Sequence, residues 1–186
     1  MVSKPLVVPK RILILGPSGA GKSTLARRIG HRLAPPVVHL DALYWNPGWA
    51  PSEAVLFRER VAEVAARDAW VIDGNYSNHL DLRLPRAEAV IWLDLARYIY
   101  FPRAVWRCIR NYGRDRSDIG AGCPEQFEWS FFRDWVWTCP TRSRAQHAAL
   151  LANLPSGIGG IILRSPAQVE KFTSDLPRSL DGGGRG

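Results

Sequence analysis

The feature that most restricts the fold of this chain is a glycine-rich segment placed directly after a short apolar run. Residues 11–15 read R-I-L-I-L without polar alternation, which is typical of a strand covered on both faces of a parallel sheet. Residues 16–24 read G-P-S-G-A-G-K-S-T and match the pattern G-x-x-x-x-G-K-[ST]. Residues 24–33 then predict a helix, because a large aliphatic residue recurs every four positions until two prolines end the pattern. A strand, this loop and a helix in that order predict a phosphate-binding P-loop.

Each part of the motif has a chemical reason. Glycines let the backbone fold into a nest of N–H groups around a diphosphate, and the following helix adds the positive end of its dipole. Lys22 is predicted to span the β- and γ-phosphates, and the Ser23 hydroxyl is predicted to bind Mg²⁺. We therefore expect ATP and Mg²⁺ to be held by the loop residues Gly16, Pro17, Ser18, Gly19, Ala20, Gly21, Lys22, Ser23 and Thr24.

Apolar runs alternate with helical patterns along the rest of the chain. Strands are predicted over 37–40, 70–72, 89–93 and 160–163, and helices over 102–112, 145–154 and 166–176, with a further helix capped by Ser52. This alternation predicts a three-layer α/β domain, a five-stranded and mostly parallel sheet with helices on both faces. We expect a single domain over residues 1–176, with a lid inserted at about 111–144 and a flexible tail over 177–186.

The composition favours a globular protein with an anionic partner. Of the 186 residues 46% are hydrophobic, so a core is available and wholesale disorder is excluded. No stretch approaches the ~18 uninterrupted apolar residues of a membrane span, and lysines and prolines stand where a signal peptide needs its apolar run. The expected location is therefore cytoplasmic, without membrane contact. The net charge of +8 favours anionic partners but does not separate nucleotides from nucleic acid.

Cysteine and histidine give no sign of a metal-binding framework. The three cysteines, Cys108, Cys123 and Cys139, are an odd number without a C-x-x-C pair, so buried thiols are the favoured interpretation. The four histidines show no spacing suited to a metal, and we interpret them as structural or solvated.

Two strands end in an aspartate that could serve the magnesium. Asp73 closes the run W-V-I-D and is followed by Gly74, while Asp94 closes V-I-W-L-D. We favour Asp73, because the glycine lets the backbone turn close to the phosphates. Asp94 remains the alternative, and its other interpretation is an aspartate that ends a strand or forms a turn.

These residues resemble a known group of proteins. The P-loop, the strand-end Asp73-Gly74 and an arginine-rich segment between the fourth and fifth strands resemble the nucleoside and nucleotide kinases of the P-loop superfamily, to which adenylate kinase belongs. More closely, V-V-H-L-D-A-L-Y-W-N-P-G-W (37–49), W-V-I-D-G-N-Y (70–76) and Y-G-R-D-R (112–116) are similar to small bacterial adenylate-kinase-related proteins called DNA topology modulation proteins. The resemblance runs from about residue 11 to 176 and implies a P-loop kinase fold with an arginine-rich lid.

The departures from adenylate kinase bear on the acceptor. Where that family has an arginine three residues after Asp-Gly, this chain has Ser77, and its Thr-Gly-Asp string is replaced by His39-Leu40-Asp41. An aspartate at this position resembles small-molecule kinases of the shikimate and gluconate type, in which it contacts the acceptor hydroxyl. We predict that Asp41 binds the acceptor and acts as general base, since it ends a strand at the sheet edge that carries the P-loop. A helix or turn cap is the alternative.

Other residues are candidates for the acceptor and the adenine. Tyr44, Trp45 and Trp49 could form a stacking wall for a ring or pack their lobe against the core. Arg83 and Arg86 could reach the acceptor or cap the strand that follows. The resemblance places Ser165-Pro166 beside the adenine, with contacts mainly through the backbone.

Arginines form a second group of candidates. Arg103, Arg107, Arg110 and Arg114 share one helical face, and the neighbouring arginines are Arg116, Arg142 and Arg144. Like charges on one face repel, so an anion or acidic side chains must lie opposite. The resemblance implies that lid arginines neutralise charge on the transferring phosphoryl group; we favour Arg110 and Arg114 as catalytic and assign Arg142 to the acceptor. The alternative is pairing with Asp115, Asp118, Glu125 or Glu128.

Three functions fit these features. The favoured one is a Mg-ATP-dependent phosphotransferase with a small acceptor. A nucleic-acid-associated regulator would use the basic lid helix on phosphates and nucleotide as a switch, but no helix-turn-helix, zinc finger or ribonucleoprotein signature is present. A P-loop hydrolase without a small acceptor is the third. The sequence identifies neither the acceptor nor the oligomeric state.

Overall fold

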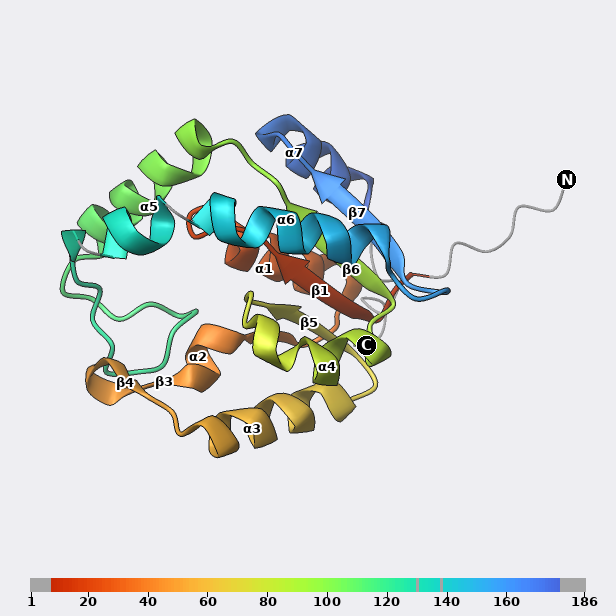
Figure 1. Cartoon of the computed structure of the whole chain (residues 1–186), viewed down its shortest axis with the longest axis horizontal. Helices are drawn as coiled ribbons and strands as arrows, with labels where there is room; N and C mark the ends of the chain where they lie inside the picture. Colours follow the sequence, from red (N-terminus) through yellow and green to blue (C-terminus); the bar gives the residue numbers. More distant parts are fainter. Residues whose placement is uncertain (1–7, 130, 138, 178–186) are drawn as a thin grey trace, which may run out of the picture.

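The centre of the computed structural model is a five-stranded parallel sheet, and the structure describes residues 8–129, 131–137 and 139–177 (Figure 1). The strands lie in the order β2-β5-β1-β6-β7. Their bounds are β1 (Arg11–Leu15), β2 (Val37–His39), β5 (Trp70–Asp73), β6 (Ala89–Leu93) and β7 (Gly159–Leu163). The strand before the P-loop is therefore central, and the predicted fold class is confirmed.

Helices cover both faces of the sheet (Figure 1). The helices on one face are α1 (Lys22–Leu33), α5 (Arg97–Asn111) and α7 (Pro166–Asp175). Those on the other are α2 (Leu40–Tyr44), α3 (Ala54–Ala66), α4 (Leu80–Arg83) and α6 (Cys139–Ala152). None of the helices within the described ranges is long and apolar enough to cross a membrane.

Both faces of the central strand β1 carry apolar side chains, because helices cover the sheet on both sides. Ile12 and Ile14 pack into the core beneath α1 and α5, whereas Leu13 and Leu15 pack into the core beneath α3, and all four are at most 2% exposed. A strand buried on both sides has no reason to alternate polar and apolar residues. Trp70 and Trp92 are buried in the second of these two cores.

The start of α5 differs from the prediction. The helix begins at Arg97, so Pro102 lies inside it and not in its first turn. A proline at this position removes the hydrogen bond to the carbonyl of Tyr98. Tyr98 is 79% exposed, so water can reach that carbonyl, while buried Tyr100 and Ala104 hold the same turns against the core. Tertiary packing thus keeps the helix continuous at Pro102.

The predicted cap at Ser52 is also corrected. The residue that precedes α3 is Glu53, and no side-chain cap is formed there. The Ser52 hydroxyl is buried and donates to the carbonyl of Leu43 at 3.2 Å, while Arg60 donates to it at 3.1 Å. The serine therefore ties the start of α3 to the preceding loop.

Several short elements were not predicted, because each is too short to show a period. They are the antiparallel pair β3 (Trp45–Asn46) and β4 (Ala50–Pro51), the turns η1 (Pro47–Trp49), η2 (Ser77–His79) and η3 (Leu84–Arg86), and the π-helical η4 (Phe131–Val136). The predicted lid also overlaps α6, which begins at Cys139.

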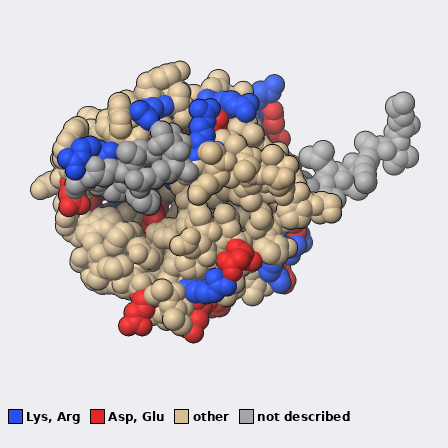
Figure 2. All heavy atoms as spheres, viewed as in Figure 1, with Lys and Arg blue, Asp and Glu red and all other residues tan. Residues whose placement is uncertain are grey.

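Positive charge is unevenly distributed over the face seen in Figure 2. Basic side chains gather along the edge where Figure 1 places α5, α6 and α7, while both signs of charge alternate along the edge near α3. Two partly exposed arginines at this basic edge, Arg144 and Arg164, converge on Asp94. Part of the excess charge is therefore paired within the protein.

Candidate active site

The P-loop joins β1 to α1 at the carboxyl edge of the sheet. Gly19 and Gly21 have φ values of 81° and 93°, which a residue with a side chain rarely adopts, so the loop needs glycine at these positions. Helix α1 begins at Lys22, and the Lys22 ammonium donates to the carbonyl of Pro17 at 3.1 Å. The lysine thus folds back over the loop, in front of the N-terminal end of α1, where an anion is favoured.

Asp73 lies beside the P-loop because β5 is a neighbour of β1. Asp73 pairs in register with Ile14, only 3% of it is exposed, and its Oδ1 lies 2.7 Å from Nδ1 of His39. An ionised carboxylate can only accept, so Nδ1 is the protonated nitrogen of this ring when Asp73 is charged. This contact fixes the aspartate at the edge of the sheet.

The alternative aspartate, Asp94, ends β6 on the other side of β1 and has a different environment. Its Oδ1 accepts from Nε of Arg144 at 2.9 Å, and its Oδ2 lies 3.6 Å from Nε of Arg164. Two guanidinium groups therefore already compensate its charge. This supports the choice of Asp73 over Asp94 for the metal.

A third carboxylate reaches the P-loop from the lid. Asp118 lies near enough to the Ser23 hydroxyl for that group to lower its pKa, and its two oxygens accept from Nε and Nη2 of Arg116 at 3.0 and 2.6 Å. Arg116 also donates to buried Glu125 at 2.7 Å. Burial alone would raise the pKa of Asp118, but the Arg116 hydrogen bond and charge, with the Ser23 hydroxyl, hold that pKa well below its usual range. The sequence identified Asp118 only as a pairing partner for arginines, because its approach to Ser23 depends on the path of the lid.

These donors are suitable for magnesium. Within the described ranges no cluster of three or more His, Cys, Asp or Glu side chains could hold a metal ion. The Ser23 hydroxyl and the Asp73 carboxylate are hard oxygen donors, and Mg²⁺ in phosphate sites commonly takes only one or two carboxylates beside the phosphate oxygens. The residues present fit a magnesium ion that binds together with a nucleotide.

Asp41, the predicted acceptor-binding residue, lies in the first turn of α2 directly after β2. Its side chain is exposed, and the Tyr76 hydroxyl donates to its Oδ1 at 2.7 Å. Burial, and then the negative charge of Asp41, raise the pKa of Tyr76, so the phenol remains a protonated donor. The contact orients Asp41 and directs one carboxylate oxygen away from the tyrosine.

One short loop, residues 74–76, links the two sides of the site. The Asn75 side chain accepts from the backbone N–H of Gly16 at 3.0 Å, and Tyr76 beside it donates to Asp41. Tyr76 has a φ of 30°, an unusual conformation for a residue with a side chain. A strained backbone held between two functional groups indicates that their relative position matters.

Arg83 holds this loop and does not face the acceptor. It is 0% exposed, and its guanidinium donates to the carbonyls of Gly74, Asn75 and Tyr76 at 3.1, 2.8 and 3.0 Å. Burial lowers its pKa to about 10, and the nearby Asp81 charge opposes that shift. The predicted contact between Arg83 and an acceptor is therefore corrected to a positioning role.

Arg86 lies at the wrong edge of the sheet for substrate binding. Its guanidinium donates to the carbonyl of Ala66 at 3.0 Å, and its own carbonyl accepts from Arg11 at 2.6 Å. Arg11 begins β1, so Arg86 belongs to the amino ends of the strands, opposite the P-loop. The predicted role of Arg86 on the acceptor side is corrected.

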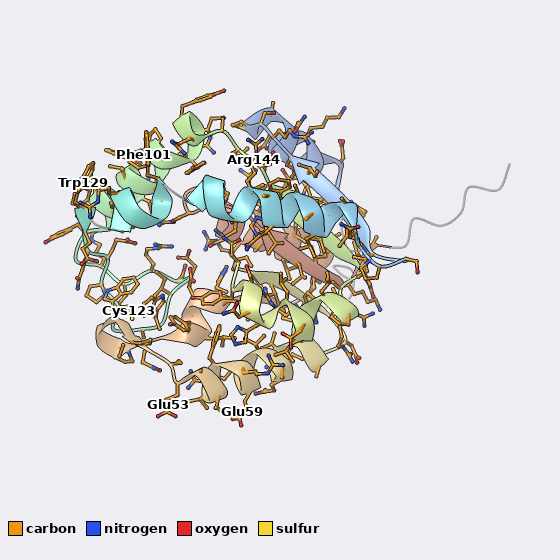
Figure 3. All side chains as sticks on the ribbon, viewed as in Figure 1. Glu53, Glu59, Phe101, Cys123, Trp129 and Arg144 are labelled. Atoms are coloured by element: carbon orange, nitrogen blue, oxygen red, sulfur yellow. The ribbon has the colours of Figure 1, made fainter. Side chains whose placement is uncertain are left out.

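The three predicted aromatic residues form a cluster that is bound to the lid. Tyr44 contacts the rings of Trp45 and Tyr76 at centroid distances of 4.8 and 5.2 Å, and Trp49 contacts Trp45 at 5.5 Å. The Trp49 indole donates to the carbonyl of Pro124 at 2.8 Å. Figure 3 shows Cys123 of the lid near β3 and β4, where its thiol donates to a backbone carbonyl at 3.1 Å. The rings pack the lobe together, and Tyr44 also reaches the residue that orients Asp41.

Arg107 contacts the P-loop directly. Its Nη2 donates to the Ser18 hydroxyl at 3.2 Å, and its Nε is buried without a hydrogen-bond partner among the described residues. Arg110 and Arg114, which the sequence favoured, are exposed. Arg107 is nearer because the turn of α5 that carries it is buried at Ala104 and packs on the P-loop.

The remaining candidates have simpler outcomes. The side chain of Arg142 lies outside the described residues. Ser165 caps α7 by accepting from the backbone of Gln168 at 3.2 Å, and Pro166 occupies the first turn.

The predicted burial of Cys108 and Cys123 is confirmed. Burial and then Glu125 raise the pKa of Cys108 to about 12, so this thiol is a donor and not a nucleophile.

We predict that buried His147 lowers the free energy of unfolding of the protein in acid. It is 2% exposed, and burial, followed by the Lys22 charge, lowers its pKa to about 4 against an ordinary 6.5, while Asp94 acts in the opposite direction. Between these pH values the unfolded chain binds a proton that the folded chain does not, so stability falls as pH drops from 6.5 to 4. His147→Gln should remove about 2 kcal/mol of this loss, as measured by urea unfolding at pH 7 and pH 4.5. Parallel losses in both proteins would contradict the prediction.

Comparison with known proteins supports the fold. No family model matches the chain, and no curated protein sequence matches it. A shikimate kinase structure from Bacteroides thetaiotaomicron is 18% identical, with a TM-score of 0.53, and the match covers 91% of this chain and 96% of that one. A shikimate kinase from Acinetobacter baumannii, solved with shikimate, is 16% identical with a TM-score of 0.58 and covers 90% of both chains.

A gluconokinase structure from Sinorhizobium meliloti 1021 also matches, at 17% identity and a TM-score of 0.48, over 90% of this chain and 95% of that one. Likeness at such identities concerns the fold alone. The protein has the fold of the P-loop kinases, with the sheet order and flanking helices described above. The similarity to DNA topology modulation proteins remains a prediction.

Proposed function

We propose that the protein is a Mg-ATP-dependent phosphotransferase that transfers the γ-phosphoryl group of ATP to a hydroxyl of a small acceptor. The observation that carries the proposal is the loop at residues 74–76, which hydrogen-bonds Gly16 of the P-loop on one side and Asp41 on the other. Phosphoryl transfer needs positioning more than covalent chemistry from the protein. A rigid link between a phosphate-binding loop and a strand-end carboxylate supplies such positioning.

On the nucleotide side, the P-loop backbone and Lys22 would bind the phosphates of ATP, with Ser165 and Pro166 near the base. Ser23 and Asp73 would hold the magnesium, while Arg116 already binds both carboxylate oxygens of Asp118. The metal would neutralise charge on the phosphate oxygens. Arg107 would add positive charge next to Ser18, and Arg110 and Arg114 would do so when the lid approaches.

On the acceptor side, Asp41 would accept the proton of the attacking hydroxyl, mainly orienting it. Tyr76 keeps the aspartate in place, and the cluster of Tyr44, Trp45 and Trp49 would border the acceptor. Arg142 would contribute a charge from α6. The names of the structural neighbours, shikimate kinase and gluconokinase, support a small hydroxylated compound as the acceptor class.

The decisive experiment measures ATP consumption with Mg²⁺ against a panel of nucleosides, nucleoside monophosphates, sugars and hydroxy acids. One acceptor should raise the rate, and Lys22→Ala should lower the stimulated rate by about a hundredfold or more, since it removes charge stabilisation of the transferring group. Circular dichroism of the variant checks that it folds. Slow ATP hydrolysis that no acceptor stimulates would refute the transferase and favour the hydrolase, and strongly salt-dependent DNA binding without transfer would favour the regulator.

A further inference from the structure

A second concave site lies between α1 and α7, apart from the P-loop. The groove has a volume of about 610 Å³ and is lined by residues from positions 27–32 and 170–174. Helix α1 has 12 residues and begins at the P-loop, so the groove belongs to its far half. Volumes of 300–1,000 Å³ are usual for small-molecule sites.

The groove is strongly basic. Its charged lining consists of Arg27, Arg28 and Arg32 with His31 on α1, opposed by a single carboxylate, Glu170 on α7. Arg28 and Arg32 are spaced i, i+4, and Arg27 adjoins Arg28, so like charges gather on one helical surface and destabilise the helix unless an anion compensates them. The negative end of the α1 dipole accounts for basic residues in the last turn, but Arg27 and Arg28 lie in the middle of the helix.

The hydrogen bonds leave part of this charge available. Arg28 pairs with Glu170 at 2.6 Å, but these side chains are 47% and 70% exposed, and exposed pairs of this kind are weak. Arg32 is held by the carbonyls of Ser174 and Leu176, at 3.2 Å each. Arg27 and His31 have no hydrogen-bond or ion-pair partner anywhere in the part of the chain that the structure describes.

We propose that this groove is an anion site that binds a small polyanion, such as a di- or triphosphate group. Arg27 and His31 supply unused donors, Arg32 a fixed charge, and Arg28 a guanidinium that can exchange Glu170 for a phosphate oxygen. Concavity confined to two short stretches of helix favours a small ligand over the extended backbone of a nucleic acid. The binding does not depend on the proposed transferase activity.

The test is calorimetric titration of the full chain with inorganic tripolyphosphate. The P-loop would also bind this probe, so the titration uses Lys22→Ala, in which one binding event should remain. Adding Arg27→Ser and Arg28→Ser should weaken that event by at least about tenfold, and adding Glu170→Gln should strengthen it a few-fold by removing the competing carboxylate.

Arg67→Ser, added to the same Lys22→Ala protein, is the matched control. Arg67 is a partly exposed arginine on the opposite face, paired only with Glu63 among the described residues, and its loss should leave the titration unchanged. The proposal fails if Lys22→Ala shows no saturable binding, or if Arg67→Ser weakens it as much as the groove variants do. Binding of a short DNA duplex that needs Arg27 and Arg28, without binding of tripolyphosphate, would overturn the small-ligand site in favour of a nucleic-acid surface.

Discussion

Replacing Asp41 by asparagine is expected to lower kcat by about a hundredfold or more, while the Kd for ATP stays within about twofold of the wild type. Asparagine has nearly the same shape and can still accept the hydrogen bond from Tyr76, but it cannot take the proton of an acceptor hydroxyl. The loss should therefore fall on turnover and not on nucleotide binding. Steady-state kinetics with the acceptor found in the panel, together with ATP titration, separate the two.

Tyr76→Phe is the graded companion of this variant. It removes only the donor that orients Asp41, so kcat should fall by about tenfold while the Kd for ATP stays close to that of the wild type. If Asp41→Asn retains most of the activity, Asp41 is not the general base; it is not a cap of α2 either, because His39 precedes the helix and no side-chain cap is formed there. If both variants lose ATP affinity together with turnover, the effect is structural and the proposed base is wrong.

Replacing Arg83 by methionine is expected to destabilise the fold by about 3 kcal/mol, the largest loss that we anticipate for a residue outside the hydrophobic core. The guanidinium is fully buried, and its removal would leave the carbonyls of Gly74, Asn75 and Tyr76 without this donor. Methionine fills a similar volume, so the loss reports hydrogen bonds and not a cavity. Urea unfolding measures the free energy directly.

Arg86→Met provides the matched control three residues further along the chain. Arg86 is exposed and makes one side-chain hydrogen bond in the described structure, so its loss should cost less than about 1 kcal/mol. Equal losses of stability for the two variants would show that this stretch of the chain tolerates no arginine substitution. They would not support a specific role for Arg83. A native-like stability for Arg83→Met would mean that water can replace the guanidinium.

The fold was predictable because its strongest signals are local. An uninterrupted R-I-L-I-L followed by the glycine-rich loop specifies a buried strand, a phosphate-binding turn and a helix within residues 11–33. The later strands repeat the apolar signal, and an aspartate follows or ends β2, β5 and β6 within two residues. Short elements such as η2 and α4 escape this reasoning, because three or four residues show no period and their conformation is set by packing against other segments.

The site was predictable only where chain direction places the residues. Parallel strands bring their carboxyl ends to one edge, so Asp41 and Asp73 could be located from the sequence. The places of Arg83 and Arg86 could not be predicted from the sequence. The two residues are only three positions apart, but the guanidinium of Arg83 is buried and that of Arg86 lies at the opposite edge of the sheet. The helical period likewise predicted the basic face of α5. It did not predict which turn contacts Ser18, because that contact depends on where the helix begins and how deeply it packs.

The contacts between the aromatic loop and the lid have a consequence for how substrates enter. Gly48 donates to Gly122 at 2.7 Å, Trp49 to Pro124 at 2.8 Å, and the Cys123 thiol to Asn46 at 3.1 Å. These three hydrogen bonds join residues 46–49 to residues 122–124, so the two segments should move together. Under the proposed function, a movement of residues 122–124 would therefore also move Trp49, so the border of the acceptor site would change together with the lid.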